Sequence, residues 1–496
     1  MTIPSDVSRG RLERYPMNQQ RCASRIIHIV LIAVAMLASF SPLPPLDAQT
    51  TAPKSLVITH AAVIDVVDGA VRPDQTIVIA GNRIEALGRS TDVRAPAGAT
   101  IVDAAGKYVI PGLWDSHVHT RYQGIPSLSL FIMNGVTSVR DTAGPWSHLV
   151  QIRQWKQEIA RGELLGPRIF AAGPLLDGPK SRWSHGVIVN SPEEGRRAVD
   201  EVKERGGEFV KVYDLLSRDS YFAIVDESRK VGLTFAGHLP FAISPAEASD
   251  AGQSTIEHLT GILMGCSTRE DELRRDLVAG VRVPDSVLLE TFSPAKASAL
   301  FSKFAKNHTV QDPTLSLFWT GIEAALKDPR ILSEERLQYI PASYREQWEA
   351  APGNADVTMR QRVFEKDKEM VAAMVKAGVE IIAGTDTLKA YLVPGFSLQD
   401  ELELLAQAGM TPLQVLQAAT VNPSKLFNFP DLGTVEQGKI ADLVLLDGNP
   451  LQEIRNTHRI FAVIAGGRLA DKKALGQLAQ EAKKSAASFS GPPTGR

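Results

Sequence analysis

The feature that most constrains the fold of this chain is a regular alternation of short apolar segments with helical ones. Eight segments have the apolar character of buried strands: 109–113, 137–139, 168–171, 209–212, 234–236, 254–256, 310–318 and 379–383. Stretches with helical periodicity lie between or after them: 193–205, 218–231, 365–377, 397–408 and 411–420. Strands that alternate with helices indicate a parallel sheet covered by helices. Eight such units predict an α/β fold, a closed (β/α)8 TIM-type barrel.

The composition is that of an ordinary globular protein. The chain has 496 residues, of which 44% are hydrophobic and 22% charged, and its net charge is −2. This balance, with no basic run, gives no indication of a nucleic-acid partner. The two cysteines, Cys22 and Cys266, stand alone, which argues against thiolate metal sites and a disulfide framework. The ten histidines are therefore the side chains in which to look for metal chemistry.

Residues 1–48 have the pattern of a signal peptide. Two arginines precede an apolar run at 26–40, and several prolines and the small residue Ala48 follow it. The run is shorter than the roughly 20 residues of a transmembrane helix. We therefore expect export, to the periplasm or outside the cell, with an uncleaved membrane anchor as the alternative. The stretch before the apolar run is long for a signal, and Met17 is a possible start.

Strand-like segments at both ends of the chain flank the barrel region. Residues 52–110 contain several short apolar runs separated by turn residues, and residues 432–470 contain two more. We expect them to form one composite β-sandwich domain; the alternative is two unrelated hairpins. The barrel would occupy 111–431, with a helical insertion at about 263–370 around its mouth. Residues 471–496 would form a helix that ends in a Ser/Gly/Pro-rich tail.

Potential metal ligands stand at the carboxyl ends of five of the eight expected strands. In chain order they are His117, His119, Lys211, His238, His258 and Asp386. Residues two apart on a strand share a face, so the first two histidines can direct both imidazoles at one point. Imidazole and carboxylate groups are common zinc ligands, and this end of a barrel carries the chemistry in enzymes of this fold. The spacing therefore predicts a metal site at the barrel mouth.

Each of these residues also has an ordinary explanation. A single His-x-His pair is a weak signal, His238 and His258 could be loop histidines, and Asp386 could cap a helix. Lys211 is harder to explain, because alternation places it with Tyr213 on one face of a buried strand, where an unpaired ammonium is costly. One metal-binding mouth accounts for all six residues, whereas the ordinary explanations require six separate coincidences.

Five short motifs resemble those of a known enzyme superfamily. They are Pro-Gly-Leu-Trp-Asp-Ser-His-Val-His at 111–119, Val-Lys-Val-Tyr at 210–213, Ala-Gly-His at 236–238, Ile-Glu-His-Leu at 256–259 and Ala-Gly-Thr-Asp-Thr at 383–387. With the segment Gly-Thr-Val-Glu-Gln-Gly-Lys-Ile-Ala-Asp-Leu-Val at 433–444, they are similar to the metal-dependent amidohydrolase superfamily. The similarity is greatest to its imidazolonepropionase-like and Xaa-Pro dipeptidase-like branch, and it covers about residues 55–470.

The resemblance implies a binuclear metal centre. A first divalent ion, usually zinc, would be held by His117, His119 and Asp386. A second would be held by His238 and His258, and a carboxylated Lys211 would bridge the two. Two such ions lower the pKa of a shared water and polarise a carbonyl, while Asp386 would take the water's proton and pass it to the leaving amine. The implied reaction is hydrolysis of a carbon–nitrogen bond in a small amide, cyclic amide or dipeptide.

Four residues are candidates for contact with the substrate. Tyr213 shares a face with the expected bridging lysine, and its hydroxyl could bind the substrate or the developing oxyanion, with plain packing as the alternative. Arg140 could bind a substrate carboxylate or pair structurally with Asp141. His185 lies in a polar loop near the expected mouth. Gln399 stands where similar chains often carry a histidine, so the substrate specificity can differ from theirs.

Two other functions remain open at this point. One is a mononuclear hydrolase, or a lyase or isomerase, on the same scaffold. The other is a barrel that binds a metal or another ligand without catalysis. Loss of Asp386 or Lys211 would have favoured the second alternative, and both residues are present.

Overall fold

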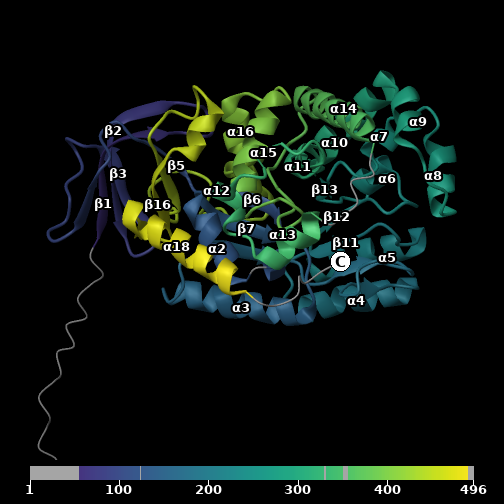
Figure 1. Ribbon diagram of the computed structural model, residues 1–496, viewed down its shortest axis with the longest axis horizontal. Helices are drawn as coiled ribbons and strands as arrows, with labels where there is room; N and C mark the ends of the chain where they lie inside the picture. The colour runs from purple at the N-terminus through teal and green to yellow at the C-terminus, as the bar shows by residue number, and fades with distance from the viewer. Residues whose placement is uncertain (1–54, 123, 329–330, 350–355, 490–496) are drawn as a thin grey trace, which may run out of the picture. The chain divides into compact units, whose positions relative to one another are not determined.

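The computed structural model describes residues 55–122, 124–328, 331–349 and 356–489, whose helices and strands are shown in Figure 1. The expected signal peptide at 1–48 lies outside the described residues, so the structure does not test it. The end of the expected C-terminal tail lies outside them too. Within the described ranges, no helix is long and apolar enough to cross a membrane.

Strands from both ends of the chain form one eight-stranded sheet, in the order β17-β16-β15-β5-β1-β2-β3 with β4 paired to β1. The N-terminal strands are β1 (Leu56–Ile64), β2 (Val71–Ala80), β3 (Arg83–Arg89), β4 (Thr100–Asp103) and β5 (Tyr108–Pro111). The C-terminal strands are β15 (Leu443–Leu446), β16 (Ile460–Ala465) and β17 (Arg468–Ala470). The two groups join where β15 runs antiparallel to β5, with Val444 opposite Ile110. Figure 1 shows these purple and yellow strands together.

The composite β-sandwich predicted from the two chain ends is confirmed. Its core contains apolar residues from both groups of strands, among them Ile58, Ile77, Val109, Leu443 and Ile464. These side chains are fully buried or nearly so. β-Branched residues pack well on a pleated surface, and burying each aliphatic side chain stabilises the fold by about 1.5–3 kcal/mol before entropic costs.

The predicted barrel is formed by short parallel strands. They are β6 (Leu113–Val118), β7 (Val136–Asp141), β8 (Arg168–Ala171), β9 (Leu175–Asp177), β11 (Val210–Val212), β12 (Phe235–Gly237), β13 (Thr255–Glu257) and β14 (Val310–Asp312). β6, β7 and β8 pair in that order, and β9, β11, β12, β13 and β14 form the next sheet, with β10 (Val187–Ile188) outside β9. The two sheets are joined by the chain itself, because β8 runs into β9 and together they make the third barrel strand.

The eighth predicted segment, 379–383, closes the ring. On one side it pairs with β14, where the amide of Ile382 donates to the carbonyl of Gln311 at 3.0 Å. On the other side the amide of Ser116 in β6 donates to the carbonyl of Ala383 at 2.8 Å. The first and last strands are therefore neighbours, and their carboxyl ends lie at the same end of the barrel.

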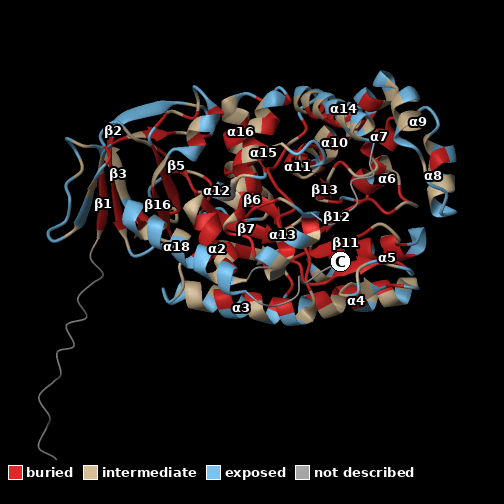
Figure 2. Ribbon diagram, in the orientation of Figure 1, coloured by how far each residue is buried: buried red, intermediate tan, exposed pale blue. Residues whose placement is uncertain are grey.

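Helices cover the barrel strands, and several begin at a Ser or Thr followed by proline. α4 (Pro192–Glu204), α6 (Pro245–Asp250), α10 (Pro294–Asn307) and α16 (Pro412–Ala418) all start in this way. The hydroxyl accepts a hydrogen bond from a first-turn amide, and proline is pre-set for the first helical position. In Figure 2 the strands and the inward helix faces are buried. The remaining helices of the first half are α2 (Ile125–Met133), α3 (Trp146–Ala160) and α5 (Arg218–Val231).

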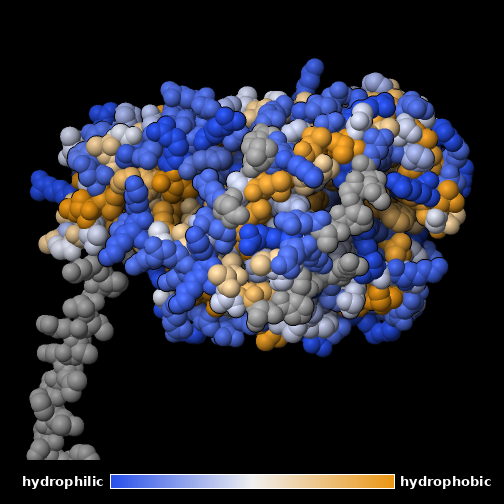
Figure 3. Space-filling view, viewed as in Figure 1, coloured by the Kyte–Doolittle hydropathy of each residue, from blue (hydrophilic) through white to orange (hydrophobic). Residues whose placement is uncertain are grey.

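The expected helical insertion corresponds to a long, mainly helical part of the chain. It contains α7 (Ile262–Gly265), α8 (Glu270–Val278), α9 (Asp285–Glu290), α10, α11 (Leu315–Ala325), α12 (Glu334–Leu337), α13 (Ala342–Glu349) and α14 (Val357–Lys376). The chain then continues through α15 (Phe396–Gln407), α16, α17 (Val421–Leu426) and, after the last strands, α18 (Lys472–Ser488). On the face shown in Figure 3, hydrophilic residues predominate and apolar residues lie in separate patches.

Two strand predictions were wrong in their boundaries. The segment 109–113 is divided at Gly112: β5 belongs to the β-sandwich, and β6 is the first barrel strand. A side chain at Gly112 would collide with Thr137, so glycine allows the close approach there. The segment 310–318 is a three-residue strand followed by α11, because Pro313 and Thr314 end the strand and Glu401 accepts hydrogen bonds from the first amides of the helix.

Candidate active site

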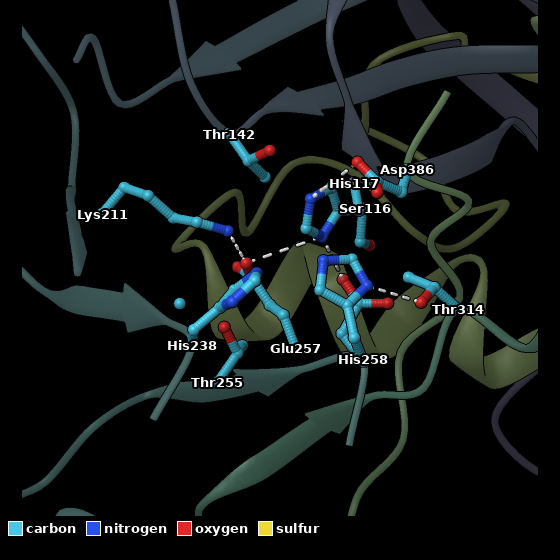
Figure 4. A network of polar contacts seen from close by, with 12 residues as sticks. Ser116, His117, Thr142, Lys211, His238, Thr255, Glu257, His258, Thr314 and Asp386 are labelled. Atoms are coloured by element: carbon cyan, nitrogen blue, oxygen red, sulfur yellow. Dashed lines mark hydrogen bonds and ion pairs between the residues drawn. The ribbon is translucent and has the colours of Figure 1, made fainter. Parts of the chain in front are cut away.

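The six predicted ligands lie together at the carboxyl ends of the barrel strands. Each comes from the position that the sequence indicated: His117 from β6, Lys211 from β11, and the others from the residues that follow β6, β12, β13 and the eighth strand. In Figure 4 the side chains of Lys211, His117 and His258 point toward one small volume. All six line the same cavity, which has a volume of about 430 Å³.

One group of donor atoms consists of His117, His119 and Asp386. Their ligand atoms all lie within 4.8 Å of one another. Asp386 Oδ1 is 2.8 Å from His119 Nε2 and 3.5 Å from His117 Nε2. The amide of Asp386 donates to the carbonyl of His117 at 2.8 Å, so the backbone of the last strand orients this carboxylate toward the first strand. Two imidazoles and a carboxylate form a donor set typical of zinc.

A second group surrounds Lys211. Its Nζ forms an ion pair with Glu257, and both side chains are buried. Glu257, His117 and His258 also have ligand atoms within 4.8 Å of one another. The rings of His258 and His238 are 5.0 Å apart. Each of these two rings is oriented by a contact of its Nδ1 atom. His258 Nδ1 is 2.7 Å from Thr314 Oγ1, and His238 Nδ1 is 2.8 Å from Asp214 Oδ1.

The electrostatics of the cluster suit cation binding. Burial, followed by the charge of Lys211, places the pKa of His117 well below its usual value, and burial acts in the same direction on the pKa of His258. Both rings are therefore neutral at pH 7, which is the form that ligates a metal. Burial opposes ionisation of Asp386, but the charge of Lys389 and the hydrogen bond from His119 outweigh it and lower the pKa of Asp386. Burial lowers the pKa of Lys211 to about 7.

One buried nitrogen of the cluster lacks a hydrogen-bond partner among the described residues. It is His117 Nδ1, which is inaccessible to solvent. An unsatisfied buried polar atom is costly unless something else binds it. Its neighbours are the carboxylates of Glu257 at 3.6 Å and Asp312 at 3.7 Å. The residues present therefore fit a divalent ion in their midst.

Two of the four predicted substrate contacts line the cavity. The Tyr213 ring stacks on His238 with centroids 4.0 Å apart, and its hydroxyl accepts a hydrogen bond from Arg182 at 3.4 Å. Burial raises the pKa of Tyr213 to about 12. His185 is in the cavity wall beside Trp183. Burial, followed by the charge of Arg121, lowers its pKa to about 4.

The structure places the other two predicted residues, Arg140 and Gln399, outside the cavity. Arg140 is buried inside the barrel and does not line the cavity. It donates to Ser116, Thr255, Glu257 and Asp312. The alternative pairing with Asp141 is also wrong, because that carboxylate binds Thr120 and His148. Gln399 is buried in α15, where its amide donates to the carbonyl of Asn134 and accepts from Thr457, so it too has a structural position.

Several residues near the cluster were not found from the sequence. Glu257 precedes a predicted ligand in the same motif, and Asp312 ends β14, so both could have been found by extending the search to acidic residues at strand ends. Lys389 and Arg182 line the cavity from loops. No periodicity marks loop residues, and only the fold brings them to the site.

The fold and the site define a barrel metallohydrolase with a composite β-sandwich. A comparison with protein-family models identifies the class: the model described as "Amidohydrolase family" matches residues 108–470. The chain belongs to the amidohydrolase family. It is therefore a metal-binding hydrolase of carbon–nitrogen bonds, and the predicted superfamily and enzyme class are confirmed.

Individual relatives agree with this assignment. An ochratoxinase from Aspergillus niger is 23% identical over 488 residues, covering 88% of this chain and 92% of the relative. The solved structure of a bottromycin amidohydrolase is similar over 91% of this chain and 96% of its own, with 22% identity and a TM-score of 0.69. The structure of a Xaa-Pro dipeptidase with bound methionine in its active site covers 84% of this chain and all of its own, with 20% identity and a TM-score of 0.61. At these identities the two solved structures support the fold.

Proposed function

We propose that this protein is an exported, binuclear metal-dependent hydrolase that cleaves the amide bond of a small molecule or dipeptide. The observation that carries the proposal is the convergence of six potential ligands, from five different strands, on one cavity. Ligands this far apart in the sequence meet only if the barrel is complete. Methionine bound in the related dipeptidase structure supports an amino-acid-like substrate. Export rests on the sequence of residues 1–48.

The donor set divides naturally between two ions. His117, His119 and Asp386 would hold one, and His238 and His258 the other, with zinc the metal that imidazole-rich sites favour. Carboxylation of Lys211 would turn its cationic amine into an anionic bridge. Glu257 would then lose its ion pair with the lysine but keep the hydrogen bond from Arg140, 2.8 Å away. When bound, such ions supply a water of lowered pKa and polarise the substrate carbonyl.

The side chains of the chain itself have assignable tasks. Asp386 is ionised and lies at the cluster, so it can accept the proton of the attacking water and return it to the leaving amine. The Tyr213 hydroxyl remains protonated at neutral pH, since its pKa is raised. It can therefore donate a hydrogen bond to the oxygen that becomes negative as the carbonyl is attacked. The ring contact with His238 holds this hydroxyl above the cluster.

The test is the substitution Lys211→Ala, followed by metal analysis and a turnover assay. The zinc-loaded wild-type protein is first screened against N-acyl amino acids, Xaa-Pro dipeptides, cyclic amides and esters for release of free amine. We expect two metal ions per wild-type chain and fewer in the variant. Turnover should fall on the order of 100-fold or more, since metal stabilisation of the transition state is worth several kcal/mol.

Lys230→Ala is the matched control. Lys230 is on the outer face of α5 with a side chain that is 72% exposed, so its removal should change neither quantity. Unchanged metal content and turnover in Lys211→Ala would contradict the two-metal proposal. One ion per wild-type chain would support the mononuclear alternative.

A further inference from the structure

The part of the cavity that faces solvent is positively charged. Besides Lys211, the cavity wall contains three cationic side chains: Arg121, Arg182 and Lys389. Exposure separates the outer wall from the metal-binding floor, because the side chains of Arg182 and Lys389 are 71% and 31% exposed, against 2% for Lys211. The acidic residue among the described lining is Asp386, which belongs to the floor. Such a wall favours an anionic substrate.

Two of the cations are held against one aromatic ring. Lys389 Nζ lies 4.5 Å from the centroid of the Trp183 ring, and the guanidinium of Arg182 lies 5.5 Å from it. Cation–π contacts of this kind orient a charged group without neutralising it. The indole therefore holds both cations at the cavity wall, and an apolar group of the substrate could lie against the nearby Leu317 and Phe318.

The carboxylates closest to these cations have other partners. Asp386 Oδ2 is 4.0 Å from Lys389 Nζ, but the same carboxylate contacts His119 and, in the proposed function, a metal ion. Asp214 Oδ2 is 3.8 Å from Arg182, but this residue orients His238. Both distances are longer than those of a close ion pair. The two cations thus retain charge that a bound anion can share.

The position of Lys389 indicates which part of the substrate carries the anion. Asp386 is the group that would deliver a proton to the leaving amine, and Lys389 is its neighbour. A carboxylate bound by Lys389 therefore lies close to the leaving nitrogen. In an α-amino acid a single carbon separates these two groups.

We propose that the substrate is an N-acyl amino acid, dipeptides included, and that Lys389 with Arg182 binds the free carboxylate of its leaving amino acid. This inference rests on the proposed hydrolase function and specifies its substrate class. Lys389 is then a specificity-determining residue. Amides of simple amines, which lack the carboxylate, are poor substrates.

The experiment compares two amides that differ only in the carboxylate, N-acetyl-leucine and N-acetyl-3-methylbutylamine. With zinc-loaded wild-type protein, we expect kcat/KM to be about 10- to 100-fold higher for N-acetyl-leucine, the range for one hydrogen bond to a charged group. Lys389→Gln should bring the two values to within a few-fold of each other, because only the first amide loses a partner for its carboxylate. Any effect through Asp386, whose pKa is lowered by the charge of Lys389, acts on both values alike. Lys366→Gln is the matched control, because Lys366 also lies over an aromatic ring, Phe292, but outside the cavity.

A binding measurement separates this inference from the proposed function. Calorimetric titration with leucine and with 3-methylbutylamine requires no turnover, and leucine should bind more tightly to the wild type but not to Lys389→Gln. If neither amide is cleaved but this preference is found, hydrolysis of these amides is excluded and the carboxylate site stands. If both amides are cleaved with equal efficiency, or if Lys389→Gln keeps the wild-type ratio, the carboxylate site is overturned and the hydrolase function stands. Equal binding of leucine and 3-methylbutylamine also overturns it.

Discussion

At the scale of single residues, Arg140 connects the strands beneath the cluster. Its guanidinium donates to the Ser116 carbonyl in β6, to Thr255 and Glu257 in β13, and to Asp312 at the end of β14. Five donors in a rigid fork suit this task better than a single ammonium. The residue thus holds two buried carboxylates beside the metal-binding histidines and acts on the site through their positions.

Replacing Arg140 by methionine should therefore destabilise the protein strongly. The substitution leaves Glu257 and Asp312 as buried carboxylates without this partner, and breaking a buried ion pair costs about 3–5 kcal/mol. Urea unfolding followed by circular dichroism measures the change. Arg161→Met is the control, since Arg161 pairs with Glu163 on the surface and surface pairs contribute little. Equal midpoints for the two variants would refute the connecting role of Arg140.

Single residues also show where reading the sequence fails. The convergence of the six potential ligands could be predicted because strand ends and period-two alternation determine where those side chains point. Arg140 was assigned to substrate from its place at a strand end, and Gln399 from a resemblance to chains that carry a histidine there. Both are satisfied by buried backbone and side-chain partners. Lys389 was overlooked because its function depends on a contact with Trp183, 206 positions earlier in the chain. A sequence pattern does not contain such a contact.

At the scale of elements, most helices agree with their sequence patterns and the errors lie at strand ends. α5 begins one residue after the Ser217 cap and ends at Gly232, and α16 begins after a complete capping box. Strands have weaker stop signals. In the segment 310–318 the polar residues Gln311 and Asp312 and the helix- and strand-breaking Pro313 separate Val310 from the apolar residues that follow, a boundary signal that the strand prediction overlooked. The amides of Leu315 and Ser316 donate to the carboxylate of Glu401, and these tertiary hydrogen bonds stabilise the start of α11.

Two glycines provide a test of element stability with matched surroundings. A methyl group added at Gly476, inside α18, or at Gly232, at the end of α5, would meet no other atom within 4 Å. Gly232 has a φ of 69° and Gly476 is helical. Gly476→Ala should therefore stabilise the protein by about 0.5–1 kcal/mol, whereas Gly232→Ala should destabilise it by about 1 kcal/mol.

Thermal melts of both glycine variants would measure these differences. The two substitutions add the same atom to the same open space, so opposite signs would isolate the backbone conformation as the cause. A loss of stability in Gly476→Ala would show that helix propensity does not limit the stability of α18.

At the scale of the whole molecule, the barrel is closed by contacts between its first and last strands. Ser116 pairs with Ala383, and Asp386 meets His119 across the same junction. A metal ion held by His117, His119 and Asp386 would add a further link between these strands. Metal occupancy and global stability are thus connected.

Removing metal should lower the melting temperature of the wild-type protein, and returning zinc should restore it. At a zinc concentration about 100 times the dissociation constant, binding to the native state alone stabilises it by about 2.7 kcal/mol. His119→Ala should lose most of this response. His458→Ala is the control, because His458 pairs with Glu403 away from the cluster. A melting temperature that does not depend on zinc in the wild type would count against a metal that joins the strands.

The closing contact between β6 and the eighth strand also determines when the protein can acquire its site. His119 and Asp386 are 267 positions apart. At a synthesis rate of about 5–20 residues per second, the histidines leave the ribosome tens of seconds before the aspartate that completes their group. The β-sandwich is completed later still, because β5 pairs with β15 near the other end of the chain. A nascent or truncated chain that lacks the eighth strand therefore cannot assemble the His117–His119–Asp386 group. Metal uptake at this group, as proposed, follows synthesis of the eighth strand.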